Sequence, residues 1–556
     1  MDKLFLIAIG GTGMRCLEAF VHLCAAGLFD NRTIEILTLD TDHNNGNKDR
    51  VETLIKLYND VKTNDNAKRG GDMRAETFFS AKLNLYRFFT DYSDSDRLSL
   101  HALATTNGLT EEQREDNQDL TDLLFDRETV QRFKLDHGYR AQTHLGSMLM
   151  YHGIIEAARN VRKGEDVKEQ EADLAKFLKL LNDNSNHARV FVFGSIFGGT
   201  GASSIPVIPI AFSEALGILT GNNAIDTNKV LFGSTLLTDY FSFKTPTDTQ
   251  LVTDKVIADS NNFALNSQAA LSFYNSDETV RGTYKRMYHI GCPPGLRINY
   301  SVGQNSNVVT GGANQRNDAH ILELMCAAAA YDFFSASRSD LEAFTEANYV
   351  FRSIETDDDG KFIFTGKSFV GPEAAEKFEN KLGAFLSFAH IILSKFDGAY
   401  DGASGTANFL NYLNEAKFPL YNDITDNQCA EIDAYLKEFG YKFLKDDVKL
   451  GWIYQINHSV NGGKFLFSPE AFKTNIRELK KIDPGIIFND PAHHWDKTGN
   501  MFDRTRFNTL VSLLKDPNIT TPDENQAATL KEQFLAHIYN AITVAQHYNL
   551  QNDFQE

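Results

Sequence analysis

The feature that most constrains the fold is a strand, a glycine loop and a helix that follow one another around Gly198. The β-branched and aromatic residues 190–193 predict a buried strand. Gly199, Thr200 and Gly201 continue the loop, and a run of small residues that can open a helix comes next. Glycines let backbone N–H groups approach an anion, and a helix start presents unpaired donors with a positive dipole. The stretch therefore predicts a phosphate-binding loop, with an ordinary glycine-rich turn as the alternative.

A second unit of this kind opens the chain. Residues 3–9 predict a buried strand, residues 10–13 a tight glycine turn, residues 14–28 a helix with apolar spacing, and residues 34–39 a second strand. Together they form a predicted βαβ unit with a glycine loop at its first turn.

A dinucleotide-binding fold is one interpretation of this unit. Gly11 and Gly13 begin the glycine fingerprint of that fold, and Asp40 or Asp42 could hold a ribose hydroxyl. Cys16 stands at the position of the third glycine, so the fingerprint is incomplete. A dinucleotide-binding enzyme would also leave the second glycine loop of the chain unexplained.

The chain between and beyond these units carries mainly helical signals. Residues 43–137 are polar, without a convincing strand, and predict an inserted helical subdomain or a solvated helical spacer. Residues 317–334 predict a long and almost wholly apolar helix, which should be central and buried. After Ser335 helix and strand signals mix, and residues 525–547 predict an amphipathic helix.

The composition disfavours several classes of protein. With 556 residues, of which 42% are hydrophobic, the chain can form two or more domains with a sizeable core. A formal net charge of −19 argues against nucleic acid as a partner, because nucleic-acid-binding surfaces are basic. The five cysteines lack paired spacing, and no apolar run approaches the ~20 residues of a membrane helix. A soluble, cytoplasmic protein without integral membrane association is expected.

The loop at residues 197–203 resembles the signature loop of the tubulin/FtsZ superfamily, which holds the phosphates of GTP. Pro206 follows soon after, as is common in bacterial members. The other segments come in a similar order along the chain. Residues 10–13 resemble the first nucleotide loop of the family, and the pair Thr41 and Asp42 resembles the second.

The similarity continues through the first 335 residues or so. Residues 138–146 stand where the third loop enters its helix, and residues 238–243 stand where the ribose-side loop would be. Asn266 falls in the helix that supplies a base contact in the family. Asn317 and Asp318 open the long apolar helix, where the family places a second base contact. The chain is therefore similar to the divergent bacterial tubulin-like proteins.

This resemblance implies an α/β fold of the tubulin/FtsZ type. A Rossmann-like parallel sheet would form the nucleotide-binding domain at residues 1–316, with the helical insertion at 43–137. A central core helix would follow at 317–335. An α+β C-terminal domain at 336–556, with a helical tail, would act as the activation-like or interaction domain.

The resemblance also implies a site for GTP or GDP, with Mg²⁺ as a possible companion and no other metal. Backbone N–H groups of the two glycine loops would hold the phosphate oxygens. The implied nucleotide-binding residues are Gly10, Gly11, Thr12, Gly13, Met14, Thr41, Asp42, Arg140, Gly198, Gly199, Thr200, Gly201, Ala202, Ser203, Asp239, Asn266, Asn317 and Asp318.

The implied function is that of a tubulin-like GTP-binding protein whose nucleotide state controls self-assembly, as an oligomer or filament, or a partner protein. Polymerising members of the family carry Asn and acidic residues after the core helix that complete the GTPase site of a neighbouring subunit. That pattern is missing after Ser335, and residues 357–359 are better explained as a solvated acidic turn. No catalytic residue is assigned, so GTPase activity stays open. The alternatives are a nucleotide-binding scaffold that does not hydrolyse GTP and an NAD(P)-dependent Rossmann enzyme.

Overall fold

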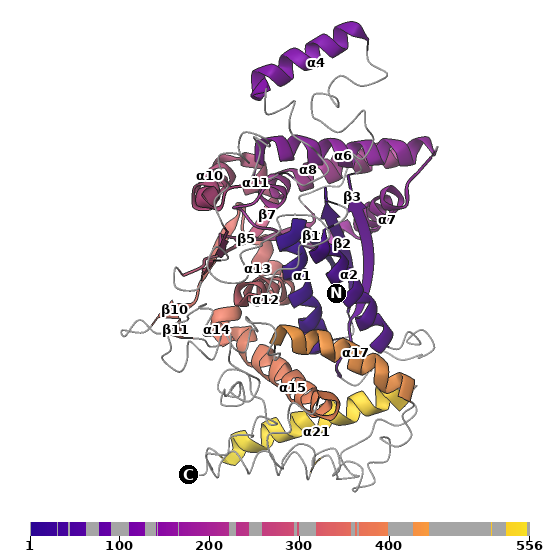
Figure 1. The fold of residues 1–556 in the computed structure, drawn as a ribbon, viewed down its shortest axis with the longest axis vertical. Coiled ribbons are helices and arrows are strands. Elements are labelled where there is room, and N and C mark those ends of the chain that lie inside the picture. Colours follow the sequence, from indigo (N-terminus) through magenta and orange to yellow (C-terminus); the bar gives the residue numbers. More distant parts are fainter. Residues whose placement is uncertain are drawn as a thin grey trace.

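The fold is α/β, with helices on both faces of a seven-stranded, all-parallel sheet (Figure 1). The computed structural model describes residues 2–30, 32–42, 45–62, 77–90, 110–127, 139, 141, 143–164, 166–221, 229–243, 258–293, 297–299, 319–356, 362–363, 366–397, 426–443, 513 and 530–552.

The sheet has the Rossmann-like strand order, extended by one strand. Its strands run in the order β3-β2-β1-β4-β5-β7-β9, and all neighbours pair in parallel. Their bounds are β1 (Lys3–Ile9), β2 (Thr33–Asp40), β3 (Lys82–Phe89), β4 (Ala188–Phe193), β5 (Leu231–Leu237), β7 (Tyr284–Ile290) and β9 (Asn348–Arg352). Four short strands pair outside it, namely β6 (Phe241–Ser242) with β8 (Ile298–Asn299) and β10 (Glu355–Thr356) with β11 (Phe362–Ile363).

The central strands read as continuous apolar runs because both faces of the sheet are covered. In β1, Leu4 and Leu6 belong to one hydrophobic core, and Phe5 and Ile7 belong to the other. The sheet therefore separates two cores, one on each face.

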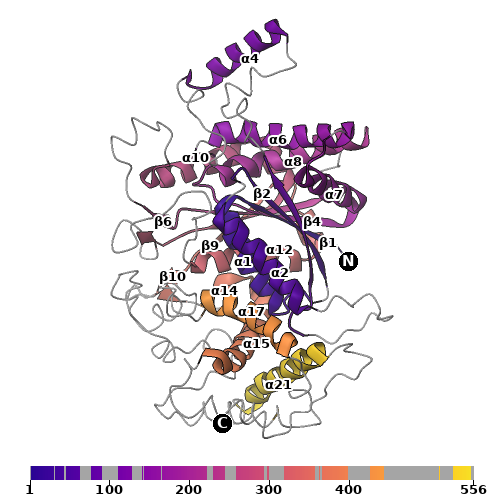
Figure 2. The ribbon, with the colours of Figure 1, turned by 45° about the vertical axis from the view of Figure 1, so that its right-hand side comes forward.

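Three helices cover one face of the sheet, and a thicker layer covers the other (Figures 1 and 2). The first face carries α6 (Thr143–Lys163), α7 (Glu169–Asp183) and α8 (Thr200–Thr220), with α10 (Phe263–Ser276) and α11 (Glu278–Thr283) beside them. The second carries α1 (Gly10–Ala25), α2 (Gly46–Val61) and α12 (Ile321–Ser335), backed by α15 (Pro372–Asp397), α17 (Asp426–Phe443) and α21 (Leu530–Asn552). Short helices α13 (Arg338–Glu342) and α14 (Gly366–Phe369) follow α12.

The predicted buried central helix is confirmed as α12. All but two of its residues are buried, and its alanine run, residues 327–330, lies in the core that it shares with α1. It begins at Ile321 in the structure. Asn317 and Asp318 lie outside the described residues.

Two local predictions differ from the structure. Residues 10–13 are the first turn of α1 rather than a separate turn, because Gly10 adopts a φ of +64° that leads directly from strand into helix. The second difference is β3, a strand within the stretch expected to be only helical. Lys82 and Arg87 interrupt its apolar pattern, as charged residues often do on an edge strand.

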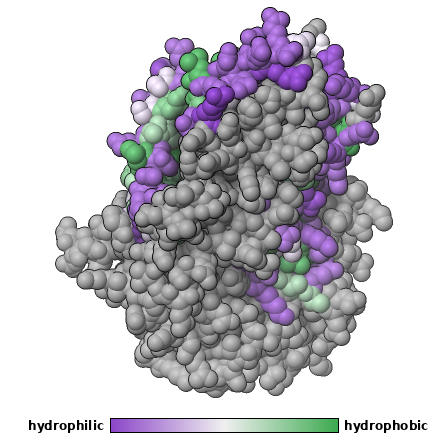
Figure 3. Space-filling view, turned by 45° about the horizontal axis from the view of Figure 1, so that its top comes forward, coloured by the Kyte–Doolittle hydropathy of each residue, from purple (hydrophilic) through white to green (hydrophobic). Residues whose placement is uncertain are grey.

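Helix α4 (Glu111–Leu124) projects beyond α6 in both ribbon views (Figures 1 and 2). Most of its side chains are exposed, including Leu123. The described residues on the face in Figure 3 are mainly hydrophilic, with smaller hydrophobic areas between them.

One described helix, α8, is long and apolar enough to cross a membrane, which the sequence pattern did not predict. However, 61% of its apolar window is buried inside the protein, as expected for a core helix.

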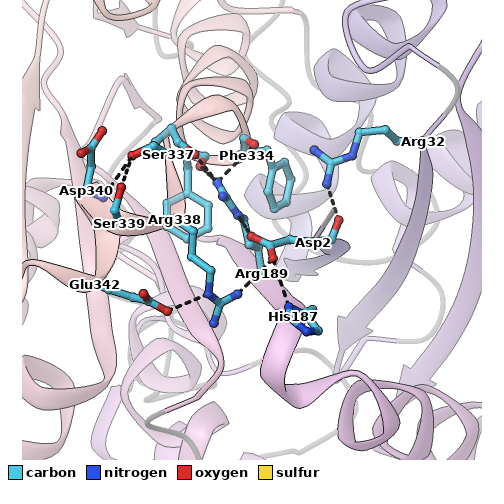
Figure 4. Close-up of polar contacts among 12 residues, drawn as sticks. Asp2, Arg32, His187, Arg189, Phe334, Ser337, Arg338, Ser339, Asp340 and Glu342 are labelled. Carbon is cyan, nitrogen blue, oxygen red and sulfur yellow. Dashed lines mark hydrogen bonds and ion pairs between the residues drawn. The ribbon is translucent and has the colours of Figure 1, made fainter.

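A polar cluster closes the amino-terminal end of the sheet (Figure 4). We call Asp2, Arg189 and Arg338 the Asp2 clasp. Asp2 Oδ2 lies 2.6 Å from Arg189 Nε, and Asp2 Oδ1 lies 3.0 Å from Arg338 Nη1. Arg189 Nη1 also donates to the carbonyl oxygens of Phe333, Phe334 and Ala336 at 3.1, 3.3 and 2.6 Å. The clasp therefore fixes the carboxyl end of α12 to the starts of β1 and β4.

Candidate functional site

The site begins where β1 and β4 lie side by side. After β1 the chain continues to β2 on one side, whereas β4 and β5 lie on the other side. In open parallel sheets, ligands bind outside the carboxyl ends of the strands at such a switch point. Both predicted glycine segments emerge there, one after each strand.

The two glycine segments touch each other. A Cβ atom added at Gly10 would lie 3.1 Å from Thr200 Cβ. A Cβ at Gly201 would lie 2.6 Å from the carbonyl oxygen of Ser195, and one at Gly13 would lie 2.7 Å from that of Phe193. The two distances below 3.0 Å leave no room for a side chain at Gly13 or Gly201, and the φ of +64° favours glycine at Gly10.

Helices α1 and α8 both start at this contact, and neither start has a side-chain cap. Neither has an acidic residue in its first turn. By contrast, Asn45 caps α2, Thr110 caps α4 and Ser337 caps α13. First-turn N–H groups have no partner within their helix, and the positive helix end favours an anion. Two uncapped starts in contact are therefore suited to phosphate.

The exposure of the loop residues indicates the side from which a ligand would approach. Gly11, Thr12, Gly198 and Thr200 are partly exposed, whereas Gly13, Met14, Gly199, Gly201, Ala202 and Ser203 are buried. The first group can meet a ligand, and the second group supports the loops from within.

The predicted third segment packs against the second glycine loop. A Cβ at Gly199 would lie 2.8 Å from the backbone nitrogen of Ala141 and 2.8 Å from Tyr139 Cβ. Ser147 Oγ donates to the carbonyl oxygen of Ser203 at 2.9 Å. The structure thus brings three of the predicted segments together. Arg140 lies outside the described residues.

The end of β2 contributes a group that the sequence interpretation assigned only to a dinucleotide fold. Asp40 is buried, and its Oδ1 accepts from the backbone nitrogens of Thr41 at 2.8 Å and Asp42 at 3.3 Å. Asp40 Oδ2 and Thr41 Oγ1 are buried without a hydrogen-bond partner among the described residues. Burial and the neighbouring Asp42 charge raise the pKa of Asp40 to about 7, although Lys48 and two backbone hydrogen bonds oppose the shift.

The residues predicted to contact the ribose and the base, Asp239 and Asn266, each bond to another residue of the protein. Asp239 Oδ2 lies 2.6 Å from Arg297 Nη2. Asn266 Nδ2 donates to the carbonyl oxygen of Phe197 at 3.3 Å, directly before the Gly198 loop. Asn266 is thus beside the site, with its amide engaged by the loop backbone.

These residues fit the phosphate part of a nucleotide. The glycine-led helix starts offer neutral N–H donors, and the Thr41 hydroxyl can donate a further hydrogen bond, whereas Asp40 Oδ2 is an oxygen acceptor suited to a hydroxyl group or a cation. The acidic residues 357–359 lie outside the described residues, as do Asn317 and Asp318, for which a base contact was predicted.

No protein-family model, curated protein or solved structure matches the chain.

Proposed function

We propose that this protein is a tubulin-like GTP-binding protein, with its phosphate site between the starts of α1 and α8. One observation carries this proposal: two glycine-led, uncapped helix starts touch at the switch point of the sheet. One such start suits a single phosphate group. Two in contact suit a chain of phosphates, because donors and positive helix ends approach it from both sides.

The order of the segments supports the tubulin type of this Rossmann-like sheet. The glycine-rich first turn of α1 follows β1, Thr41 and Asp42 follow β2, a second glycine loop follows β4, and a buried helix, α12, packs behind α1. The carboxylates of Asp40 and Asp42 are the kind of oxygen ligand that Mg²⁺ prefers. A bound Mg²⁺ would neutralise phosphate charge at this end of β2.

We further propose that the nucleotide state controls self-assembly or a partner protein. The segment after α12 lies beside the Asp2 clasp, at the opposite end of the sheet from the glycine loops. The 15 residues of α12 span about 22 Å between these ends. A residue from the segment after α12 could therefore reach only the phosphates bound to a second copy of this protein. GTP hydrolysis would then depend on assembly.

Analysis of the nucleotide content of the purified protein tests the binding proposal. Denaturation should release GTP or GDP, and calorimetry should show binding of either nucleotide to the emptied protein. Release of NAD instead, with no binding of GTP or GDP, would exclude the proposal in favour of a dinucleotide enzyme.

A pair of threonine variants tests the position of the site. Thr200→Ala should weaken nucleotide binding about tenfold, the effect of one lost hydrogen bond to a charged group. Thr220→Ala is the matched control, because Thr220 is the last residue of α8, at the far end of the helix from the site, where its Oγ1 donates to Leu216 O at 2.8 Å. Equal affinities for the two variants would place the phosphates elsewhere.

A further inference from the structure

Tyr240 lies where the elements around the candidate site meet. It follows β5 in the chain and is fully buried. The centroid of its ring lies 6.0 Å from that of Phe197 and 4.9 Å from that of His320. The guanidinium carbon of Arg15 lies 5.5 Å from the Tyr240 ring centroid. One ring therefore contacts the residue before Gly198, the N-cap of α12 and the second turn of α1.

The Tyr240 hydroxyl completes a buried ionic network. It donates to Glu323 Oε1 at 3.2 Å, and Arg15 Nη2 forms an ion pair with the same oxygen. The backbone nitrogen of His320 donates to Glu323 Oε2 at 3.3 Å. Arg15 is 2% exposed and Glu323 is 0% exposed, so water cannot replace a missing partner. We call Arg15, Tyr240, His320 and Glu323 the Tyr240 network.

A buried network of this kind favours the one arrangement of its elements in which Arg15, Tyr240 and Glu323 meet. Removing a partner from a buried ion pair leaves an uncompensated charge, and partly satisfied networks are strongly unfavourable. Its members stand on α1, on the loop after β5 and at the start of α12, and Phe197 links them to the second glycine loop. The network therefore favours the arrangement in which α1, the loop after β5, the start of α12 and the second glycine loop all pack around Tyr240.

We propose that Tyr240 is the positioning residue of the nucleotide site, an inference that rests on the function proposed above. Its hydroxyl holds the start of α12 through Glu323, and its ring holds the two glycine segments in register through Arg15 and Phe197. Tyr240 acts by keeping the loop at residues 238–243 and the start of α12 against the glycine loops.

A matched pair of tyrosine variants tests this role in the full-length protein. Tyr240→Phe removes only the hydroxyl that donates to Glu323 near the start of α12. Tyr288→Phe removes the hydroxyl of another fully buried tyrosine, which donates to Asp332 Oδ2 at 2.7 Å and accepts from Arg286 Nη1 at 3.4 Å near the other end of α12. Both should lower the melting temperature to a similar degree. Only Tyr240→Phe should weaken GTP and GDP binding measured by calorimetry, by about tenfold.

Hydrogen exchange without nucleotide separates this inference from the proposed function. Backbone amides at residues 238–243 and in the first turns of α1 and α8 should exchange faster in Tyr240→Phe than in Tyr288→Phe. If the wild type binds neither GTP nor GDP but this difference persists, the proposed function fails and the positioning role stands. Equal exchange in the two variants, or equal nucleotide affinities in a wild type that binds, would overturn the positioning role.

Discussion

The burial of Asp40 in the fold gives this residue a property, a raised pKa, that its place beside Thr41 and Asp42 in the sequence does not indicate. Thr41 and Asp42 resemble a nucleotide-loop pair in the sequence, whereas the sequence marked Asp40 only as a possible ribose contact of a dinucleotide fold. In the fold it is buried with one unpaired oxygen, and this environment raises its pKa to about 7. A raised pKa at the end of a central strand is typical of functional carboxyls.

The raised pKa predicts how stability changes with pH. The folded-state pKa lies above the ordinary value of 3.8, so the stabilisation from Asp40 is complete below pH ~4 and is lost as the pH rises through about 7. Asp40→Asn removes this titration. Between pH 5 and pH 8 the free energy of unfolding of the variant should therefore gain roughly 3 kcal/mol relative to the wild type. Urea unfolding of the wild type and the variant at both pH values measures the change. An equal change in the free energy of unfolding of both proteins between pH 5 and pH 8 would contradict the prediction.

Arg189 in the Asp2 clasp supports stability rather than binding. Burial alone would raise the pKa of Asp2, but the hydrogen bonds and charges of Arg189 and Arg338 outweigh it and hold that pKa below 3.8. Arg189→Met leaves Asp2 Oδ2 and three carbonyl oxygens without the Arg189 donor, although Arg338 still pairs with Asp2 Oδ1, and this should cost about 3 kcal/mol. Chemical denaturation measures the loss. Arg281→Met, which breaks the exposed pair with Glu346, should shift the midpoint little.

At the scale of the element, helix α8 contains two glycines with different roles. Gly201 stands in its first turn, where a Cβ would collide with the backbone of Ser195. Gly217 stands near its last turn, and a Cβ there would meet nothing within 4 Å. The helix therefore tolerates a side chain at its far end but not at the start that forms the candidate site.

Alanine at these two positions should have opposite effects. Gly217→Ala should stabilise the protein by about 0.5–1 kcal/mol, because alanine has the higher helix propensity. Gly201→Ala should lower stability and abolish nucleotide binding, because the loop must move away from Ser195. Thermal unfolding and calorimetry with GTP measure both. A Gly201→Ala variant that binds normally would remove the start of α8 from the site.

The elements show how far sequence reasoning reached. The strand at residues 3–9 and the helix α12 were predicted because burial on all sides leaves a local apolar pattern. The edge strand β3 was missed because its pattern is broken by charges. The Tyr240 network was also missed, because Arg15 and Glu323 are joined by the fold and no local pattern marks two residues about 300 positions apart. Periodicity reports burial, whereas a site depends on contacts between distant segments.

At the scale of the whole molecule, the described C-terminal helices share a core with the sheet. Phe385 of α15, Tyr435 of α17 and Ile538 of α21 belong to the same buried cluster as α1. The Tyr435 hydroxyl lies 2.9 Å from His22 Nδ1, and Lys531 Nζ donates to the carbonyl oxygen of Asp60 at 2.8 Å. A change at the candidate site would therefore be felt by these helices through their contacts with α1 and α2.

Assembly is the property expected of the whole molecule. Sedimentation velocity and negative-stain microscopy should show larger species with GTP than with GDP, and assembly should rise with protein concentration. At 100 times its dissociation constant, either nucleotide should also add about 2.7 kcal/mol to the free energy of unfolding. If the protein binds GTP or GDP but forms no nucleotide-dependent oligomer, the scaffold alternative would be favoured over a GTP-controlled polymer.

The central position of β1 also has a consequence for how the chain matures. β1 is made first, yet Lys3 pairs with Ala188 of β4, which emerges from the ribosome 185 residues later. At usual rates of synthesis this interval lasts about 10–40 s. Throughout it, one side of the most apolar strand stays open, even if β2 has already paired with the other. An unpaired apolar edge is a template for aggregation, so the newborn chain should depend on chaperones during this interval, before it can bind any nucleotide.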